Sequence, residues 1–431
     1  MFALVIIYFS SFIITKSEDV VNNPYNKRQD LLAEQIVRGS ILSSDGKTIA
    51  YTKGNENGIE QRIYPYSELF AHPVGRLSKG RTGIEFSENF RLLTSNTNGL
   101  KKILMDLTGQ KNLGDDVIST LNHDLQKIAY DGLGNNKGAI VVIEPSSGKI
   151  LAMVSKPAYD PNNIDNIWDN IKDDRENKAL MNRATSEAYP PGSIFKMVTV
   201  LEFIRQNPNY ESYTFECDGT YKNIACESVH GSIGLKESIS KSCNGSLAYI
   251  GENLDFDKFK KTIADLNLDT YLPDDLDYND PLVAIGQGDV RISPLQMAEF
   301  TSALANGGIG MKPYLVDHIS NSDGNLVKKF TPEINKRYLE SQEAEVLTEY
   351  MAEVVNSGTA TRLQSDKYTA AGKTGTAQNA EGKKSHSWFI GFANTDKPEI
   401  ALSIIVENAG YSSENAVPIA KDIFNTFYNS K

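Results

Sequence analysis

The hydrophobic pattern changes character near residue 137. From residue 18 to that point, short apolar runs alternate with turn-forming residues, which is typical of a mostly β segment. Residues 38–51 predict a hairpin, because two apolar runs flank the turn sequence SSDG. Residues 100–130 instead predict a helix that is interrupted at Leu113-Gly114, with further apolar positions at Val117, Ile118, Leu121 and Leu125.

Two continuously apolar runs open a second unit after the turn-rich stretch DGLGNN at residues 131–136. Residues 139–144 and 150–154 predict strands that are covered on both faces. Five helices are expected next, at residues 193–206, 235–252, 256–266, 294–306 and 341–356. Two apolar strands follow at residues 387–393 and 399–406, and a last helix at residues 418–428. Strands at both ends with helices between them predict an α+β domain whose terminal strands share one sheet.

A serine three residues before a lysine occurs four times in this chain. Ser44–Lys47 and Ser146–Lys149 lie in predicted turns, where no helix aligns the two side chains. Ser193–Lys196 differs, because it follows Tyr-Pro-Pro-Gly and opens a strongly apolar helical run. On a helix the two side chains share a face, and burial lowers the pKa of a lysine until it can act as a neutral base. A capping serine beside a lysine that reaches solvent is the simpler alternative, and this pair alone leaves both open.

Two later motifs favour Ser193. Ser242-Cys243-Asn244 follows directly on the fourth pair, Ser238–Lys241, and Lys373-Thr374-Gly375 occurs once. Serine enzymes that recognise penicillin carry S-x-x-K, an S-D-N type motif and K-T-G in this order. Only Ser193, then Ser242, then Lys373 places all three within one domain. The alternatives are a helix cap for Asn244 and an exposed strand lysine for Lys373.

With these motifs, the chain resembles the class B penicillin-binding proteins, the monofunctional D,D-transpeptidases of peptidoglycan synthesis, and among them the penicillin-binding protein A group. The resemblance covers nearly the whole chain; besides the motifs it rests on residues 138–162, 183–196, 284–298, 356–361, 370–378 and 386–393. It implies an α+β transpeptidase domain, a central antiparallel sheet flanked by helices, at residues 138–431. A mostly β pedestal of the dimerisation type is expected at residues 17–137, and a truncated membrane anchor at residues 1–16. The hairpin departs from the family at Ser43-Ser44-Asp45, where an acid–Arg pair is usual.

The resemblance also implies a role for each motif residue. Ser193 attacks the penultimate D-Ala carbonyl of a stem peptide, forms an acyl-enzyme and releases D-Ala. Lys196 takes the proton of Ser193. Ser242 relays a proton to the leaving amine, and Asn244 orients Lys196 and binds the peptide backbone. Lys373 places positive charge near the terminal carboxylate of the substrate.

The remaining site residues are expected on the strand that carries the third motif. Thr374 and Thr376 add hydroxyl donors, and Gly375 lets the substrate strand come close. The oxyanion hole is expected to be the backbone N–H groups of Ser193 and Thr376. The implied activity is a cell-wall cross-linking reaction that β-lactams inhibit covalently, with no cofactor and no metal. The implied partners are stem peptides and a membrane glycosyltransferase of the elongation or division machinery.

Charge and the N-terminus bear on partners and location. The net charge of −11 argues against nucleic-acid binding, which needs basic clusters on the protein surface. Residues 2–15 are uncharged and mostly apolar, but a membrane span needs about 20 such residues. A signal anchor that lacks its cytoplasmic start is favoured over a buried core helix. The catalytic domain is then expected outside the bacterial cell membrane.

Three cysteines and two histidines leave further possibilities. A Cys217–Cys226 disulfide is one alternative in an extracytoplasmic protein. A zinc site of Cys217, Cys226 and His230 is another, but it needs a fourth ligand or a water. A Ser–His triad is not favoured, because His386 lies beside aromatic residues of an expected core strand, so His386 and His230 receive no catalytic role.

Two rival functions remain. A β-lactamase or D,D-carboxypeptidase needs a deacylating base, and no clear counterpart lies between Asn244 and Lys373, apart from the acidic stretch 274–280. A β-lactam sensor or a structural partner without activity is the second rival, but the chain keeps Lys196 and Lys373. The deacylation rate discriminates the first rival from a transpeptidase.

Overall fold

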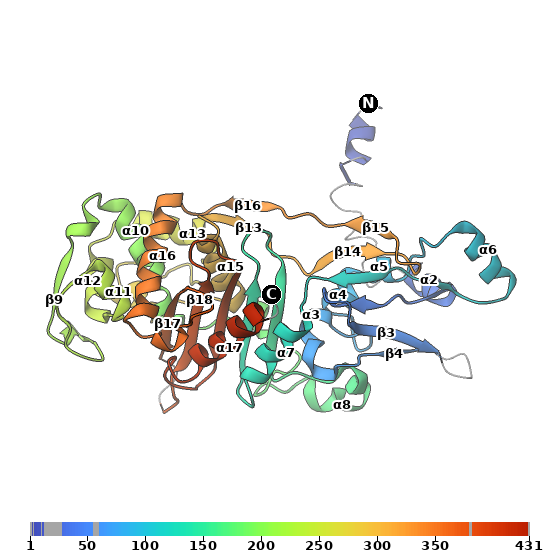
Figure 1. Ribbon diagram of the computed structural model, residues 1–431, viewed down its shortest axis with the longest axis horizontal. Helices are drawn as coiled ribbons and strands as arrows, with labels where there is room; N and C mark the ends of the chain where they lie inside the picture. Colours follow the sequence, from blue (N-terminus) through green and yellow to red (C-terminus); the bar gives the residue numbers. More distant parts are fainter. Residues whose placement is uncertain are drawn as a thin grey trace. The chain divides into compact units, whose positions relative to one another are not determined.

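The computed structural model describes residues 2, 4–9, 11–12, 28–54, 60–378 and 382–429 (Figure 1). Backbone contacts divide the chain into two compact units. The first comprises residues 1–123, 158–176 and 315–331, and the second comprises residues 124–157, 177–314 and 332–431. Each unit has its own main sheet.

The first unit is built on a six-stranded sheet of order β15-β14-β6-β2-β3-β4. Its strands are β2 (Ile41–Leu42), β3 (Thr48–Gly54), β4 (Glu60–Ile63), β6 (Asp116–Ser119), β14 (Val316–Ser320) and β15 (Leu326–Lys329). The antiparallel pairing of β2 with β3 confirms the predicted hairpin. A separate parallel pair joins β1 (Ile36–Val37) to β5 (Asn112–Leu113). The helices are α2 (Arg28–Gln35), η1 (Ser67–Phe70), α3 (Ala71–Val74), α4 (Gly83–Ser87), α5 (Asn89–Leu92), α6 (Gly99–Leu107), η2 (Pro161–Asn163) and α8 (Ile164–Ile171).

The prediction of helix across residues 100–130 is wrong in its middle. Only α6 and α7 (His123–Gly132) are helical, and Val117 and Ile118 lie in strand β6. Val117 pairs with Ile41 on one side and with Ile319 on the other. β-branched residues favour a strand when neighbouring strands are available. The partner at Ile319 is distant in sequence, so local periodicity does not reveal it.

A buried ion cluster stabilises the first unit. Glu85 is fully buried on α4 and accepts hydrogen bonds from Arg38 Nε and Arg62 Nε, both at 2.7 Å. Tyr64 donates a further bond to Glu85 at 3.2 Å. Burial by itself raises the pKa of Glu85, but the two guanidinium groups outweigh it and hold that pKa below its ordinary value. Arg38 and Arg62 come from the hairpin region and from β4, so Glu85 ties the sheet to α4.

The second unit is built on a five-stranded antiparallel sheet of order β17-β18-β19-β7-β8. Its strands are β7 (Gly138–Ile143), β8 (Ile150–Lys156), β17 (Ala370–Ala377), β18 (His386–Ala393) and β19 (Ile400–Val406). β19 pairs with β7, with Leu402 opposite Val142, which confirms that the two ends of the domain share one sheet. Every residue of β7, β18 and β19 is buried, so both faces of the sheet are covered.

Helices pack on this sheet and form the rest of the unit (Figure 1). α15 (Pro294–Ala305) and α17 (Ala416–Asn429) both contact β18 and β19, and α16 (Ser341–Asn356) contacts β17. The other helices are α9 (Arg183–Ser186), η3 (Gly192–Ile194), α10 (Lys196–Gln206), η4 (Tyr210–Ser212), α11 (Leu235–Ser240), α12 (Asn244–Glu252), α13 (Phe256–Asp265), α14 (Pro281–Ala284) and η5 (Thr361–Leu363). Short strands complete it: β9 (Thr214–Cys217), β10 (Thr220–Tyr221), β11 (Ile224–Ala225), β12 (Gly231–Gly234), β13 (Ile309–Met311) and β16 (Ile334–Arg337).

The predicted anchor at residues 1–16 lies partly outside the described residues. Within the described part of the chain, no helix has both the length and the apolar character that crossing a membrane requires. The anchor therefore stays a prediction.

Candidate active site

Ser193 lies in the tight turn η3, directly before α10. Gly192 adopts a left-handed φ of 57° and donates its N–H to Gly286 O at 2.8 Å. A Cβ on Gly192 would lie 3.0 Å from Thr376 O, and one on Gly286 would lie 2.4 Å from Gly192 O. Glycine at both positions lets three segments meet at the serine. The α-helix was expected from residue 193, but a 3₁₀ turn precedes it.

The segment that leads to Ser193 is held by side chains of the sheet. Trp388 Nε1 donates to Pro190 O at 2.9 Å. Tyr189 Oη donates to Glu407 at 2.8 Å, and Arg183 forms an ion pair with the same carboxylate at 2.8 Å. These contacts anchor the turn to β18 and to the end of β19, so the position of Ser193 is set by the sheet.

Lys196 is fully buried on the first turn of α10. Its Nζ donates to Ser242 O at 2.8 Å and to Asn244 Oδ1 at 2.7 Å, and lies 3.3 Å from Ser242 Oγ. Burial lowers the pKa of Lys196 to about 8, although Cys243 and Cys226 oppose the shift. At this pKa about a tenth of the amine is neutral at pH 7, and the neutral amine is the form that a general base requires.

Ser242 lies in a sharp break between α11 and α12. The sequence predicts one helix over 235–252, and this is wrong, because the chain leaves the helix at residues 241–243. Ser242 adopts a left-handed φ of 56°, which is uncommon for a residue with a side chain. Such strain is typical of functional positions when the surroundings hold it. The break turns the Ser242 hydroxyl toward two lysines.

Lys373 is the second of these lysines. It is fully buried on β17, which excludes an exposed strand lysine, and its Nζ donates to Ser242 Oγ at 2.9 Å and to Thr374 O at 3.1 Å. Burial and the neighbouring Lys196 hold the pKa of Lys373 well below its ordinary value. One serine hydroxyl thus lies between two buried amines, and protons can pass between them through it.

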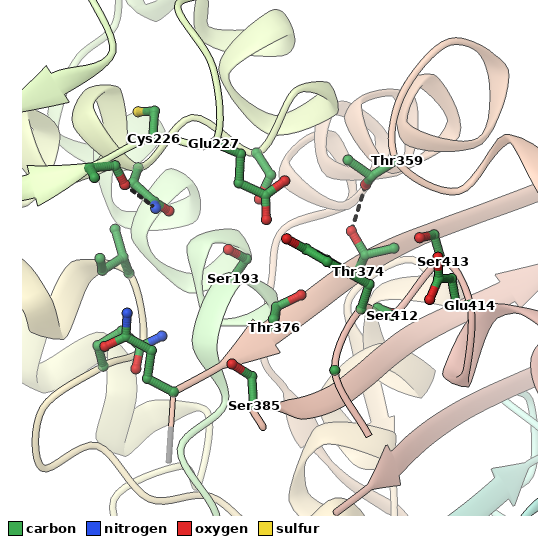
Figure 2. A pocket seen from close by; sticks show the side chains of 18 of the residues that line it. Ser193, Cys226, Glu227, Thr359, Thr374, Thr376, Ser385, Ser412, Ser413 and Glu414 are labelled. Atoms are coloured by element: carbon green, nitrogen blue, oxygen red, sulfur yellow. Dashed lines mark hydrogen bonds between the residues drawn. The ribbon is translucent and has the colours of Figure 1, made fainter. Parts of the chain in front are cut away.

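Ser242 lines a cavity of about 760 Å³, and Figure 2 shows this cavity from close by. Its wall includes Ser193, Ser242, Asn244, Thr374 and Thr376. The structure therefore brings the residues of all three motifs together at one site, with the two lysines buried behind the wall.

Several residues of the cavity wall were not singled out from the sequence. They include an acid from each side of the cavity and a threonine from the segment after α16: Glu227, Glu414 and Thr359. Thr359 Oγ1 lies 2.5 Å from Thr374 Oγ1, so the two hydroxyl groups share a hydrogen bond (Figure 2). Residues 356–361 supported the resemblance, but no spacing rule connects Thr359 to Thr374.

Gly375 lies where β17 passes the serine turn. A Cβ at this position would be 3.0 Å from both Pro191 O and Ile194 Cγ2. The missing side chain therefore lets β17 pack against η3. β17 is also the edge strand of its sheet, and none of the described strands pairs with its edge opposite β18, which leaves that edge available to an extended ligand.

The other candidate serines and the histidine lie elsewhere. Ser44 Oγ donates to Leu121 O at 3.1 Å in the first unit, and Ser146 is exposed in the turn between β7 and β8. Ser238 is buried and donates to Gly234 O at 2.7 Å. His386 is buried in β18, where its Nδ1 accepts the backbone N–H of Asn408 at 3.2 Å. Among the described residues, none of these four lines the cavity.

Two family models match this chain, and together they cover parts of both units. The model described as penicillin binding protein transpeptidase domain matches residues 138–425. The model described as penicillin binding protein A dimerisation domain matches residues 38–117.

Individual relatives agree with these matches. The chain is 31% identical to peptidoglycan D,D-transpeptidase PbpA of Mycolicibacterium smegmatis, over 90% of this chain and 87% of the relative. It is 27% identical to peptidoglycan D,D-transpeptidase MrdA of Acinetobacter baumannii, over 84% and 65%. Among solved structures, the ceftriaxone acyl-enzyme complex of penicillin-binding protein A from M. tuberculosis is similar with a TM-score of 0.80 and 27% identity, covering 92% of this chain and 99% of that one.

Proposed function

Since this chain belongs to the penicillin-binding protein transpeptidases, we propose that it cross-links stem peptides of bacterial peptidoglycan through an acyl-enzyme at Ser193. The observation that carries the proposal is the position of Ser242. Its hydroxyl lies between the buried amines of Lys196 and Lys373, and Ser193 lines the same cavity. We assign catalysis to residues 138–431 and a pedestal role to residues 17–137.

In the first step, Ser193 Oγ attacks the carbonyl carbon of the penultimate D-Ala and its proton passes to neutral Lys196. The negative charge then forming on the carbonyl oxygen is stabilised by the backbone N–H groups of Ser193 and Thr376. Each such donor is typically worth about 3 kcal/mol. When the amide bond breaks, the amine of the leaving D-Ala takes a proton through Ser242, and Asn244 keeps Lys196 in position.

The terminal carboxylate of the substrate is proposed to bind near Lys373, Thr374 and Thr376. A carboxylate placed close to a buried lysine favours the charged amine and raises its pKa again. Substrate binding would then charge Lys373. Thr359 holds the Thr374 hydroxyl and orients it.

In the second step, an amine of a neighbouring stem peptide attacks the acyl-enzyme and frees Ser193. A hydrolase would use water and needs a base to activate it. Among the described residues, the acidic stretch 274–280 contributes none to the cavity wall, whereas Glu227 and Glu414 do. Slow deacylation of a penicillin adduct is expected of a transpeptidase, because its acyl-enzyme is meant for an amine acceptor and not for water. Complete turnover of penicillin within seconds would contradict a transpeptidase, and loss of that turnover in Glu227→Gln would identify the base.

β-lactams are proposed to acylate Ser193 because they mimic the acyl donor. The proposed partners are the stem peptides and a membrane glycosyltransferase that supplies the glycan strands. The proposed location is the outer side of the bacterial cell membrane, held by an N-terminal anchor. A relative that carries the name peptidoglycan D,D-transpeptidase supports the proposed reaction, and a similar solved structure that is an acyl-enzyme complex supports the proposed acylation of Ser193 by β-lactams.

Labelling with a fluorescent penicillin tests the nucleophile. Ser193→Ala should abolish labelling, because the acyl group then has no acceptor oxygen. Ser238→Ala is the matched control, since Ser238 also precedes a lysine by three residues, and it should still be labelled. Peptide mapping should place the adduct on the Ser193 peptide, and labelling that survives Ser193→Ala would overturn the assignment. Cross-linking of lipid-linked peptidoglycan with a glycosyltransferase partner then tests the reaction itself.

A further inference from the structure

Three cysteines and a histidine meet beside the active site. We infer that this chain binds one Zn²⁺ ion through Cys217, Cys226, His230 and Cys243. Their ligand atoms all lie within 4.8 Å of one another. The sequence indicated three of these ligands, and the structure adds Cys243, which comes from the break between α11 and α12.

The distances fit a metal site better than a disulfide. Cys226 Sγ lies 3.7 Å from Cys243 Sγ and 3.8 Å from Cys217 Sγ. A tetrahedral zinc with Zn–S bonds of about 2.3 Å has S···S edges of about 3.8 Å, whereas a disulfide needs about 2.05 Å. His230 Nδ1 lies 3.3 Å from Cys217 Sγ. All three cysteines are free, and a disulfide would join only two of them.

The backbone brings the four ligands together from separate segments. Cys217 ends β9 and pairs with Gly231 at the start of β12, which places His230 next to it. The β10–β11 hairpin returns the chain to Cys226, whose N–H donates to Gly219 O at 2.9 Å. Cys243 is the N-cap of α12.

The surroundings suit metal-bound thiolates. Backbone N–H groups donate to two of the sulfur atoms, from Gly245 to Cys226 at 3.3 Å and from Ser246 to Cys243 at 3.4 Å. Hydrogen bonds of this kind orient metal ligands and stabilise their charge. Cys217 and Cys243 are buried, and the cluster supplies four protein ligands. A site with four protein ligands has no open position for substrate, so the ion is structural.

The position of Cys243 connects the ion to catalysis. Cys243 lies between Ser242 and Asn244, the two residues that bind Lys196. Asn244 Nδ2 also donates to Ala225 O at 2.8 Å, one residue before Cys226. An ion at Cys226 and Cys243 would therefore fix the catalytic break to the segment 214–234.

Metal analysis of the full chain, purified without chelators or a histidine tag, tests the inference. We expect about one zinc per chain, and native mass spectrometry should show one Zn²⁺ with three thiol protons displaced. Cys243→Ser and His230→Ala should lose the metal. His230→Cys, which restores a fourth ligand, should retain it. His318→Gln is the matched control, because His318 lies in β14 of the first unit, and it should keep full zinc content.

A second measurement on the unaltered chain covers the case in which the variants do not fold. Thiol modification should release one zinc for three cysteines modified, and cobalt substituted for zinc should give sulfur-to-cobalt charge-transfer bands and tetrahedral d–d bands. A metal-free chain with a disulfide, or with three thiols that react without releasing zinc, would overturn the inference. Zinc that persists after Cys243→Ser would also overturn it.

Discussion

At the residue scale, the site depends on two lysines that the protein keeps out of water. Burial removes water from the charged form of an amine, and the solvation free energy lost is larger than the free energy gained from a few hydrogen bonds. The pKa of a buried lysine therefore falls. Both lysines share Ser242 as a neighbour, and the charge of Lys196 disfavours the charged form of Lys373. The motif residues are therefore one coupled proton system, in which Ser242 is the common member.

The rate of acylation by a penicillin should rise with pH through about 8. Lys196, with its pKa lowered to about 8 by burial, acts only as the neutral amine. Well below that pH, the second-order rate constant should fall by about tenfold per pH unit, because the neutral fraction falls by that factor. Stopped-flow labelling across this range measures it. A flat profile would show that Lys196 does not take the proton, and the labelling of denatured protein controls for chemistry of the penicillin itself.

At the element scale, two elements meet at a distance that only glycine allows. β17 carries the third motif and packs against η3, which carries Ser193. Gly375 lies at the contact, with Pro191 O and Ile194 as its neighbours. The sheet therefore sets the spacing between the nucleophile and the N–H group of Thr376.

Gly375→Ala should slow acylation while the chain stays folded. The new methyl group would lie 3.0 Å from Pro191 O, so the serine turn or the strand must shift by a few tenths of an ångström. A misplacement of about 1 Å costs about 10²-fold in rate, so a loss of about tenfold is expected here. Penicillin labelling rates and circular dichroism measure the two effects. Gly99→Ala is the matched control, because its methyl group meets no atom within 4 Å, and it should label at the normal rate.

At the scale of the whole molecule, each unit has its own means of stability. The second unit closes its sheet by pairing β19 with β7, so the ends of the domain hold each other. The first unit has short strands and relies on the buried cluster around Glu85. A buried ion pair of this kind is costly to break, because removing one partner leaves uncompensated charge.

Glu85→Gln should lower the free energy of unfolding by about 3–5 kcal/mol, since it leaves Arg38 and Arg62 buried without their counter-charge. Urea unfolding followed by fluorescence measures the loss. The pKa of Glu85 is lowered in the folded state, so its contribution is present above the unfolded pKa and is lost as the pH falls through the folded value. Glu345→Gln, at an exposed position of α16, should change stability by less than about 0.5 kcal/mol. Equal stability of the two variants would contradict a stabilising role for the cluster.

Much of the secondary structure of the second unit can be predicted from the local pattern of apolar and polar residues. The continuous apolar runs at β7, β8, β18 and β19 predict strands, because a strand covered on both faces needs apolar residues at successive positions. Helices α13, α15 and α16 lie within one or two residues of their predicted bounds. The patterns fail at β6 and at the break at Ser242, where a distant strand or buried lysines outweigh local propensity.

The sequence by itself determined which chemistry this chain carries, because the three motifs stand in a fixed order and each needs only its own few residues. Tertiary structure alone decided how that chemistry is arranged. It buries Lys196 and Lys373, bends the chain at Ser242, adds Thr359 and Glu227 to the cavity wall, and brings Cys243 to Cys217, Cys226 and His230. Desolvation and contacts between distant segments are properties of the folded surroundings, so no local pattern specifies them.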